Sequence, residues 1–288
     1  MTMDPHRRLQ KAFFDAPTLP LSRHARYVLF SDCHRGRGNS NDNFLKNQHL
    51  YSAALQYYHR HGYTYIELGD GDELWENRSM GQIMDIHRDT FDLLARFYRE
   101  KRLYLLYGNH DIIKMSSAKA RQSFTPLFPR ITFHSGLILK DMEHKKDIYL
   151  THGHQTDLFN STLWPVNRFL VRYLWGPLER RGFLDPTSAA KNNKKKRRTE
   201  EKLTEWAKEN GCILITGHTH RPMIGTADAP YCNTGSCVHP YGITCIEIHH
   251  RCLTLVKWMV ETKPDQILYV SREKLADTIC IDDLKTYL

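Results

Sequence analysis

The chain has 288 residues, enough to bury one large α/β core or a core that carries an insertion. Its hydrophobic content of 41% and charged content of 25% are ordinary for a soluble globular protein. No apolar run approaches the roughly 20 residues that a membrane-spanning helix needs, and residues 1–10 lack the apolar stretch of a secretory signal. The seven cysteines are odd in number and contain no CxxC pair. We therefore expect reduced thiols, no disulfide framework and a cytoplasmic location.

The net charge of +9 is concentrated in one place. Six positive charges lie within residues 191–198, so the remainder of the chain carries only +3. A duplex-binding protein needs many phosphate contacts, and this distribution therefore makes nucleic acid an unlikely partner. Glu200 and Glu201 follow the basic run, which favours a solvated helix face with local ion pairs.

Predicted strands and helices alternate from the start of the chain. Residues 26–31 are apolar, aromatic and rich in β-branched side chains, which predicts a strand. Apolar residues then recur at helical spacing from Phe44 to Tyr58. We expect this helix to begin near residues 41–43 and to end at Gly62.

The same alternation continues to the closing strands. Residues 63–68 predict a second strand, and the apolar spacing from Ile83 through Ile86 to Phe97 predicts a second amphipathic helix. Alternating strands and helices indicate an α/β architecture in which helices cover the sheets. The remaining predicted strands are 102–107, 147–151, 212–216 and an antiparallel pair, 241–249 and 252–260.

Residues 156–210 interrupt this rhythm and are predicted to form a helical lid insertion. From Leu163 onward a helix with Pro165 in its first turn is apolar on two sides, one with Val166 and Tyr173 and the other with Val171. We favour a lid packed on the core. The alternative is a cap that grips acyl chains or makes peripheral contact with an anionic membrane. The predicted division of the single domain 1–288 is a catalytic core of 25–155 and 211–260, the insertion 156–210 and a C-terminal extension 261–288.

Polar turns follow five of the predicted strands, and each turn carries side chains that bind metals. Ligands of open α/β sheets bind at the carboxyl ends of the strands, so five such turns at the same end of adjacent strands would converge on one pocket. The turns are Asp32-Cys33-His34, Gly69-Asp70-Gly71-Asp72-Glu73, Gly108-Asn109-His110-Asp111, His152-Gly153-His154 and Gly217-His218-Thr219-His220.

The residue types in these turns suit hydrolytic metal ions. Carboxylate, imidazole and amide-oxygen ligands fit Mn, Fe or Zn, and thiolates are missing from the set. One carboxylate can bridge two ions about 3.5–4 Å apart, which then contact both the attacking and the leaving oxygen of a phosphoryl displacement. A water that bridges two cations loses a proton near neutral pH and supplies hydroxide.

The ordered set DxH, GDxx(D/E), GNHD, HGH and GHTH resembles the calcineurin-like metallophosphoesterase superfamily. The resemblance covers residues from Tyr27 to about Trp258. It implies a four-layer αββα sandwich of two mixed β-sheets flanked by helices, together with two divalent transition-metal ions, for which we expect Mn with Fe or Zn as alternatives.

The resemblance also implies a role for each motif residue. His110 would be the general acid that protonates the leaving oxygen, and a metal-bridging hydroxide would be the nucleophile. Glu73 matches the acidic position that orients His110, although Asp111 is also close in sequence. The implied metal ligands are Asp32, His34 and His220 for the first ion, Asn109, His152 and His218 for the second, and Asp70 between them.

Two departures bear on the branch of the superfamily. Glu73 is followed by Leu-Trp and not by the Arg-Gly of protein Ser/Thr phosphatases. The chain looks more like the UDP-2,3-diacylglucosamine pyrophosphatase branch in three places: the run 69–75, the segment that ends at Pro222, and the insertion. That branch, however, typically has arginine at the position of His110 and aspartate at the position of His154.

These observations predict a phosphodiesterase or pyrophosphatase that acts on a phosphate-containing small molecule, nucleotide-linked or lipid-linked. The alternatives are a non-catalytic scaffold of the same fold and a nuclease of the same superfamily. The sequence gives no indication of the oligomeric state.

Several residues beside the motifs are further candidates for a role at the site. Arg35, Arg37 and Arg221 are candidates for bidentate contacts with phosphate, and surface ion pairs are the competing interpretation. Cys33 lies between two predicted ligands and is expected to point into the core. Asp72 and His154 are assigned no role beyond capping a turn or supporting a ligand.

Overall fold

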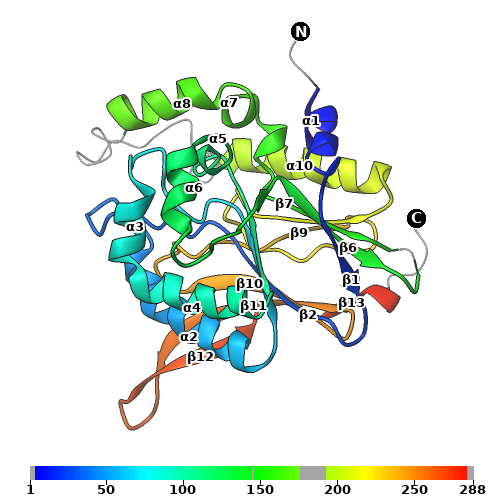
Figure 1. Cartoon of the computed structure of the whole chain (residues 1–288). Helices are drawn as coiled ribbons and strands as arrows, with labels where there is room; N and C mark the ends of the chain where they lie inside the picture. The colour runs from blue at the N-terminus through cyan, green and yellow to red at the C-terminus, as the bar shows by residue number, and fades with distance from the viewer. Residues whose placement is uncertain (1–3, 145, 176–192, 284–288) are drawn as a thin grey trace.

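Figure 1 shows the computed structural model, which describes residues 4–144, 146–175 and 193–283. Two β-sheets lie face to face with helices on their outer faces, which confirms the predicted α/β fold of two mixed sheets flanked by helices. The first sheet has the order β1 (Thr18–Leu21), β6 (Gly136–Asp141), β7 (Ile148–Thr151), β8 (Ile213–Thr216) and β9 (Tyr231–Asn233). The second has the order β12 (Leu268–Lys274), β11 (Cys252–Thr262), β10 (Ile243–His249), β2 (Arg26–Phe30), β3 (Thr64–Leu68), β4 (Leu103–Leu106) and β5 (Phe133–His134), with β13 (Ile279–Cys280) beside β11.

Helices cover both outer faces and the edge where the polar turns lie. The described helical elements are α1 (Pro5–Lys11), η1 (Leu45–Asn47), α2 (Gln48–Arg60), α3 (Met80–Ile86), α4 (Arg88–Arg99), α5 (Ile113–Ser116), α6 (Ala118–Phe124), η2 (His154–Thr156), α7 (Leu158–Ser161), α8 (Trp164–Leu170), η3 (Val171–Trp175), α10 (Asn193–Glu209) and η4 (Ile281–Asp283). None of the described helices is long and apolar enough to cross a membrane.

Strand alternation explains the layers. Successive side chains of a strand point to opposite faces, so Leu29 of β2 faces the other sheet, while Phe30 packs under α2 against Tyr51. Between the sheets, Leu29 belongs to one apolar cluster with Leu150 of β7 and Ile215 of β8. The core therefore holds the two sheets together as one sandwich.

The five strands that precede the polar turns belong to both sheets. β2, β3 and β4 are parallel neighbours in the second sheet, whereas β7 and β8 pair in parallel in the first. The expectation that all five turns follow adjacent strands is therefore wrong, because the five strands form one group in each sheet. The two groups of turns nevertheless meet, because both sheets present these carboxyl ends at the same edge of the sandwich.

Two predicted helix boundaries differ from the structure. α2 begins at Gln48 and not near residues 41–43, because the Asp42 carboxylate accepts hydrogen bonds from the backbone of Gly38 and Phe44 and holds this segment as a turn. The predicted second helix is two helices, α3 and α4, that meet at His87. The ring of His87 is buried with Nε2 2.8 Å from Asp42 Oδ2, a tertiary contact that the apolar periodicity does not reveal.

The stretch 156–210 has two parts that differ in their packing. α10 lies on the first sheet, where Leu203 and Trp206 join an apolar cluster with Leu214 of β8, so this helix is an outer layer of the sandwich. α7 and α8 lie beyond α5 and α6 (Figure 1). On this part Val171 is buried but Val166 is 54% exposed. The side chains of Leu174 and Trp175 and the start of the basic run at Lys191 lie outside the described residues.

The C-terminal residues extend the second sheet. β12 pairs antiparallel with β11 from the Val256–Lys274 pair to the Thr262–Leu268 pair, and β13 pairs with the start of β11. Cys252 and Cys280 form a disulfide at that point, while the five other cysteines are free and buried. The expectation of reduced thiols throughout is therefore wrong for this one pair. The division into core, insertion and extension stays a prediction.

A buried arginine holds the edge of the sandwich that is remote from the polar turns. Arg251, in the β10–β11 turn, is fully buried and donates two hydrogen bonds, of 2.7 and 2.9 Å, to the carboxylate of Asp141 at the end of β6. It also donates to Asp282 of η4 and to the Leu21 carbonyl at the end of β1. One guanidinium thus joins both sheets.

We predict that Arg251→Met lowers the free energy of unfolding by about 3–5 kcal/mol, because the buried Asp141 carboxylate keeps its backbone donors but loses the guanidinium that balances its charge. Urea denaturation followed by circular dichroism measures this change. The matched control is Arg23→Ala, which removes an exposed arginine 3.8 Å from Glu143 and should change stability by less than about 1 kcal/mol. Equal midpoints for Arg251→Met and the unsubstituted protein would contradict the prediction.

Candidate metal centre

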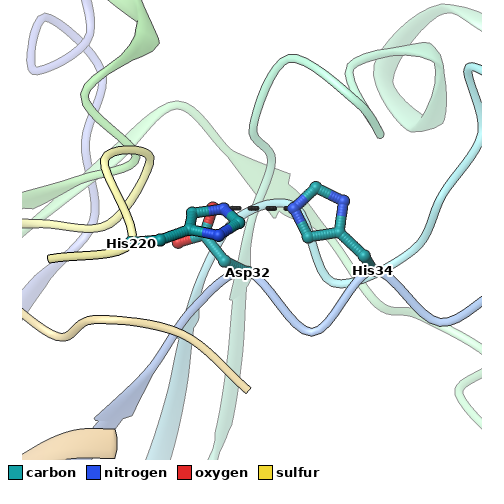
Figure 2. Close-up of side chains that lie close together, drawn as sticks. All are labelled: Asp32, His34 and His220. Atoms are coloured by element: carbon teal, nitrogen blue, oxygen red, sulfur yellow. Dashed lines mark ion pairs between the residues drawn. The ribbon is translucent and has the colours of Figure 1, made fainter. Parts of the chain in front are cut away.

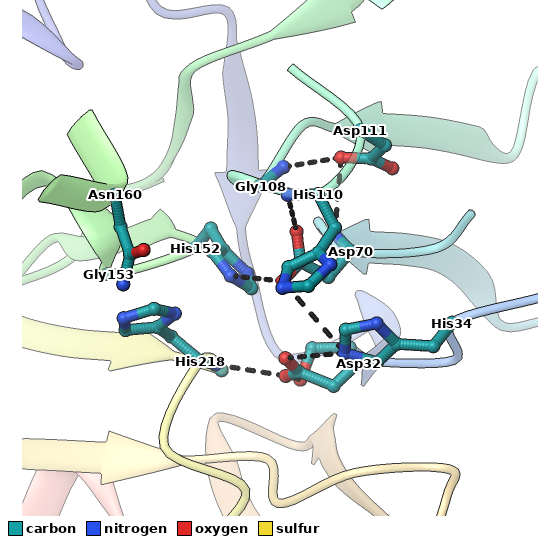
Figure 3. Close-up of polar contacts among 12 residues, drawn as sticks. Asp32, His34, Asp70, Gly108, His110, Asp111, His152, Gly153, Asn160 and His218 are labelled. Carbon is teal, nitrogen blue, oxygen red and sulfur yellow. Dashed lines mark hydrogen bonds and ion pairs between the residues drawn. The ribbon is translucent and has the colours of Figure 1, made fainter. Parts of the chain in front are cut away.

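The five polar turns form one site at the edge of the sandwich. The turns after β2 and β3 are joined by a hydrogen bond of 3.1 Å from the Asp32 amide to the Gly69 carbonyl. Those after β7 and β8 are joined by one of 3.1 Å from the Gly217 amide to the His152 carbonyl. The two pairs meet where the backbone N–H of His218 donates to Asp32 Oδ2 at 2.9 Å, a contact drawn in Figure 3.

The backbone at this site is unusual for non-glycine residues. Nine described non-glycine residues have a positive φ, and five of them are predicted metal ligands. Left-handed φ values cost energy for residues with a side chain, and they persist where the surrounding structure holds them, often at functional sites. The five predicted ligands are Asp32 (φ 52°), His34 (49°), Asp70 (50°), His218 (69°) and His220 (55°).

Asp32, His34 and His220 form the first group of ligand-type side chains. Figure 2 shows the Asp32 carboxylate behind the His220 ring, with the His34 ring to one side. Asp32 Oδ1 lies 3.0 Å from His220 Nε2 and 3.8 Å from His34 Nε2. The other ring nitrogen of His34, Nδ1, lies 2.9 Å from Glu73 Oε2. This contact orients the ring so that Nε2 faces Asp32.

Asp70, His152 and His218 form the second group. Asp70 Oδ2 lies 3.1 Å from His152 Nε2, and His152 Nδ1 donates to the Leu68 carbonyl at 2.9 Å. Because Nδ1 is engaged by this carbonyl, Nε2 is the ring nitrogen that faces the site. Asp70 Oδ2 also lies 3.9 Å from His34 Nε2, so Asp70 sits between the two groups (Figure 3).

A pair of metal ions fits these side chains. Two ligand atoms about 2.1 Å from one ion lie about 3–3.4 Å apart, which is the spacing of Asp32 Oδ1 and His220 Nε2 and of Asp70 Oδ2 and His152 Nε2. Several buried atoms of the site lack a hydrogen-bond partner among the described residues, as expected for atoms that bind a cation. They are Asp32 Oδ1, His34 Nε2, Asn109 Oδ1, His152 Nε2 and His218 Nε2.

Neighbouring imidazoles lower the pKa values of the two buried aspartates, Asp32 and Asp70. Burial would raise the pKa of Asp70, but the neighbouring imidazoles of His152 and His110 outweigh it and hold this pKa below its usual value. Burial likewise opposes ionisation of Asp32, and the charges of His220 and His152 again lower its pKa. Both carboxylates are therefore ionised near neutral pH and available as ligands.

His110 lies beside the metal-ligand groups and is held on two sides. Its Nδ1 lies 2.7 Å from Glu73 Oε2, the oxygen that also contacts His34. Its ring stacks on Trp75 with 4.3 Å between centroids. Burial lowers the pKa of His110, but the charges of Glu73 and Asp70 more than offset this and raise it above the usual value. The side chain is 24% exposed, so a reacting molecule can reach it.

A buried network of charges supports the turns from beneath. Arg35 donates two hydrogen bonds of 2.9 Å to Glu67 and one of 2.7 Å to Asp72. Lys114 Nζ lies 2.6 Å from both Asp72 and Asp111, and all five side chains are at most 1% exposed. Glu67, Asp72 and Asp111 are close enough together to bind a metal ion. Their charges are instead paired with the side chains of Arg35 and Lys114.

This network corrects one sequence expectation and adds residues that the sequence analysis did not assign. Arg35 cannot contact a phosphate, because its guanidinium is buried and bound by Glu67 and Asp72. The carboxylate of Asp111 accepts from the amides of Asp70, Gly71 and Gly108, so it holds two turns in place. The Asp111–Lys114 spacing of three residues was the one available signal for the network.

The remaining candidates stand apart from the ligand groups. Arg37 is exposed and donates to Asn77 Oδ1 at 2.8 Å, and Arg221 is half exposed and pairs with Glu200 at 2.9 Å. Their contacts with phosphate stay predictions. Cys33 is fully buried in the core, as predicted. His154 is buried 5.5 Å from the His152 ring, and burial lowers its pKa to about 3, so it is neutral.

Comparison with known proteins identifies a family for most of the chain. The model of the calcineurin-like phosphoesterase family matches residues 25–222. No curated protein matches the chain.

Solved structures with a similar arrangement include three of low sequence identity. An archaeal phosphodiesterase is 13% identical, with 86% of this chain and 99% of that chain covered and a TM-score of 0.38. Vps29 from Chaetomium thermophilum is 12% identical, with 90% and 98% covered and a TM-score of 0.45. A cold-active protein tyrosine phosphatase is 13% identical, with 91% and 80% covered and a TM-score of 0.43. These likenesses carry no argument about the activity of this chain.

We predict that Gly108→Ala abolishes tight metal binding. A Cβ at this position would lie 2.1 Å from Asp70 Oδ1, so the Asp70 turn or the turn after β4 must move. Metal content of the purified, Mn-loaded protein measures the effect, and circular dichroism checks that the chain is folded. The matched control is Gly81→Ala in α3, where a Cβ meets only ordinary contacts and metal content should be unchanged. Full metal content in Gly108→Ala would disprove the steric argument.

We predict that Arg35→Met lowers the free energy of unfolding by about 3–5 kcal/mol, because Glu67 and Asp72 are left buried with one fewer cation. Arg221→Ala, which removes a half-exposed ion pair, should cost less than about 1 kcal/mol. Chemical denaturation measures both. An Arg35→Met protein of unchanged stability that binds substrate more weakly would instead indicate a phosphate contact.

Proposed function

Since the chain belongs to the calcineurin-like phosphoesterase family, we propose that it is a dinuclear-metal-dependent hydrolase of phosphate esters or anhydrides, of the phosphodiesterase or pyrophosphatase type. One observation carries the proposal. Buried ligand atoms from four of the five turns converge without a hydrogen bond among the described residues, and Asp70 of the remaining turn lies among them. Carboxylates and imidazoles paired at 3.0 Å (Asp32 and His220) and 3.1 Å (Asp70 and His152) have the spacing of ligands that share a cation.

The geometry supports a specific division of ligands. Asp32, His34 and His220 would hold one ion, because their ligand atoms lie within 4.8 Å of one another. Asp70, His152 and His218 form a second such group, and Asn109 would complete it with its free Oδ1. Asp70 would bridge, since its Oδ2 faces His152 on one side and His34 on the other.

The ligand set suits Mn most closely, with Fe or Zn as alternatives, because it combines imidazole, carboxylate and amide oxygen and lacks thiolate. When bound, such ions supply an activated water and neutralise the charge of the phosphoryl group. The site's own residues supply the remaining chemistry.

His110 would donate the proton that the leaving oxygen needs. Because Nδ1 faces Glu73 Oε2 at 2.7 Å, the proton on Nε2 is the one that can be transferred to the leaving oxygen. The Trp75 ring restricts the imidazole to one plane, so the donated proton has a defined direction. After the P–O bond breaks, the leaving group departs as a neutral alcohol, or as a phosphate if an anhydride is cut, and His110 is left neutral.

A lipid-linked or nucleotide-linked substrate is supported by the surface beside the site. Val166, Phe169 and Tyr173 of α8 and η3 are 54%, 61% and 52% exposed, so this helical segment presents apolar surface to solvent. Acyl chains, or a peripheral contact with a membrane, would cover this face. UDP-2,3-diacylglucosamine-like molecules are one such substrate class.

We predict that Asp70→Ala removes bound Mn and abolishes hydrolysis of bis-p-nitrophenyl phosphate, whereas His110→Ala keeps the metal and lowers kcat by about 10²–10⁴-fold. The His110→Ala defect should be larger for esters with poorer leaving groups, because these depend more on the donated proton. Steady-state kinetics over a series of leaving groups, with metal analysis, measures both.

His24→Ala is the matched control, because it removes an exposed histidine away from the five turns and should change nothing. Undiminished turnover in both Asp70→Ala and His110→Ala would sink the proposal. A protein that binds Mn but hydrolyses no phosphoester would point to a scaffold of the same fold.

A further inference from the structure

A cavity lies between α8 and the rest of the domain, beside the turn that carries Glu73. Its volume is about 50 Å³, measured as the space open to the centres of water molecules. One water needs about 10–15 Å³ on that measure, so the cavity has room for three or four waters or one phosphate group. Leu74 and Asn77 of the β3 turn and Ile113 of α5 form part of its wall.

The wall of this cavity concentrates positive charge from three separate segments. Arg78 follows the β3 turn, Lys119 lies in α6 and Arg168 lies in α8, and each lines the cavity. No acidic residue lines it, and no ion pair with a carboxylate joins these three cations within the described part of the chain. The site therefore carries positive charge that an anion would balance.

Of the three cations, Arg168 is the one with a buried donor that no described residue partners, while Arg78 donates to the Tyr173 hydroxyl. The Nε of Arg168 is buried and has no hydrogen-bond partner among the described residues. Burial lowers the pKa of Arg168, and the neighbouring charge of Arg172 lowers it further. A buried guanidinium donor without an acceptor costs free energy, and an anion in the cavity would remove that cost.

The cavity is connected to the proposed catalytic residues through short contacts. The Leu74 amide donates to the His110 carbonyl at 3.2 Å, and Asn77 Nδ2 donates to the Glu73 carbonyl at 2.8 Å. Arg172, in η3, donates to the carbonyls of Trp75 and Leu74 at 2.7 and 2.9 Å and to that of Asn77 at 3.1 Å. The cavity and the reaction site therefore lie on the same turn, and Arg172 fixes the backbone between them.

We propose that this cavity is a phosphate-binding subsite that holds a second phosphate group of the substrate, remote from the one that is cleaved. The inference rests on the proposed function and narrows it to substrates with two separated phosphate groups. Arg168 would provide Nε–H, and Arg78 and Lys119 would provide charge from the other two walls.

Direct binding tests the subsite apart from catalysis. Inorganic phosphate is titrated calorimetrically into the full-length Asp70→Ala protein, whose metal centre is disabled, and into the same protein with Arg168→Gln and Lys119→Gln added. We expect one phosphate to bind the first protein and the added substitutions to weaken it about tenfold or more. Arg121→Gln is the matched control, because Arg121 is a cation of α6 that does not line the cavity, and it should leave the affinity unchanged.

Kinetics of the Mn-loaded enzyme gives the second readout. Thymidine 5′-(p-nitrophenyl phosphate) is compared with the same ester that carries a 3′-phosphate, so that only the second phosphate differs. We expect the ratio of the two kcat/KM values to favour the 3′-phosphate ester and to fall about tenfold in Arg168→Gln/Lys119→Gln. Absence of phosphate binding to Asp70→Ala, or binding that the cavity substitutions leave unchanged, would overturn the subsite. Hydrolysis that survives Asp70→Ala would instead overturn the proposed function.

Discussion

The site depends on keeping two ionised carboxylates, Asp32 and Asp70, together in a place that water barely reaches. Buried carboxylates are costly unless cations or hydrogen-bond donors surround them. The structure meets this cost with imidazoles in the site and with backbone amides, among them the His218 amide on Asp32 and the His110 amide on Asp70. A cation at each ligand group would balance the remaining charge. The left-handed backbone of the ligand residues follows, because only a sharply turned chain aims both amides and side chains inward.

Beneath this site, a buried network of charged side chains holds the backbone of the turns in place. Its members are Arg35, Glu67, Asp72, Lys114 and Asp111. Asp111 accepts amides from the turns after β3 and β4, so the two turns keep one relative position. Lys114 and Arg35 offset two of the three negative charges below. Glu73 connects the turns above this network, because its Oε2 contacts both His34 and His110. The metal ligands and the proton donor are therefore positioned together.

The sequence predicted a metal pocket because each motif combines ligand chemistry with a strand that precedes it, and both are local features; the assignment of individual ligands came from the resemblance to the calcineurin-like superfamily. It could not assign the turns to two sheets, since strand pairing between segments more than 100 residues apart leaves no local trace. Arg35 was misjudged for a related reason: its place beside His34 does not say on which side of the turn its guanidinium lies. The break at His87 likewise depends on Asp42, a contact made only in the folded chain. Residues whose roles come from distant partners are the ones that the sequence did not reveal.

Arg172 has a consequence for how this enzyme family can diversify. Its guanidinium binds three carbonyls of the loop that holds Trp75 and Glu73, so the helical segment after β7 is not an interchangeable module. A transplanted segment from a relative would need its own donor at this point, or the three carbonyls would lose their partners. A change of this segment that alters substrate selectivity would therefore also affect how Glu73 and Trp75 position His110.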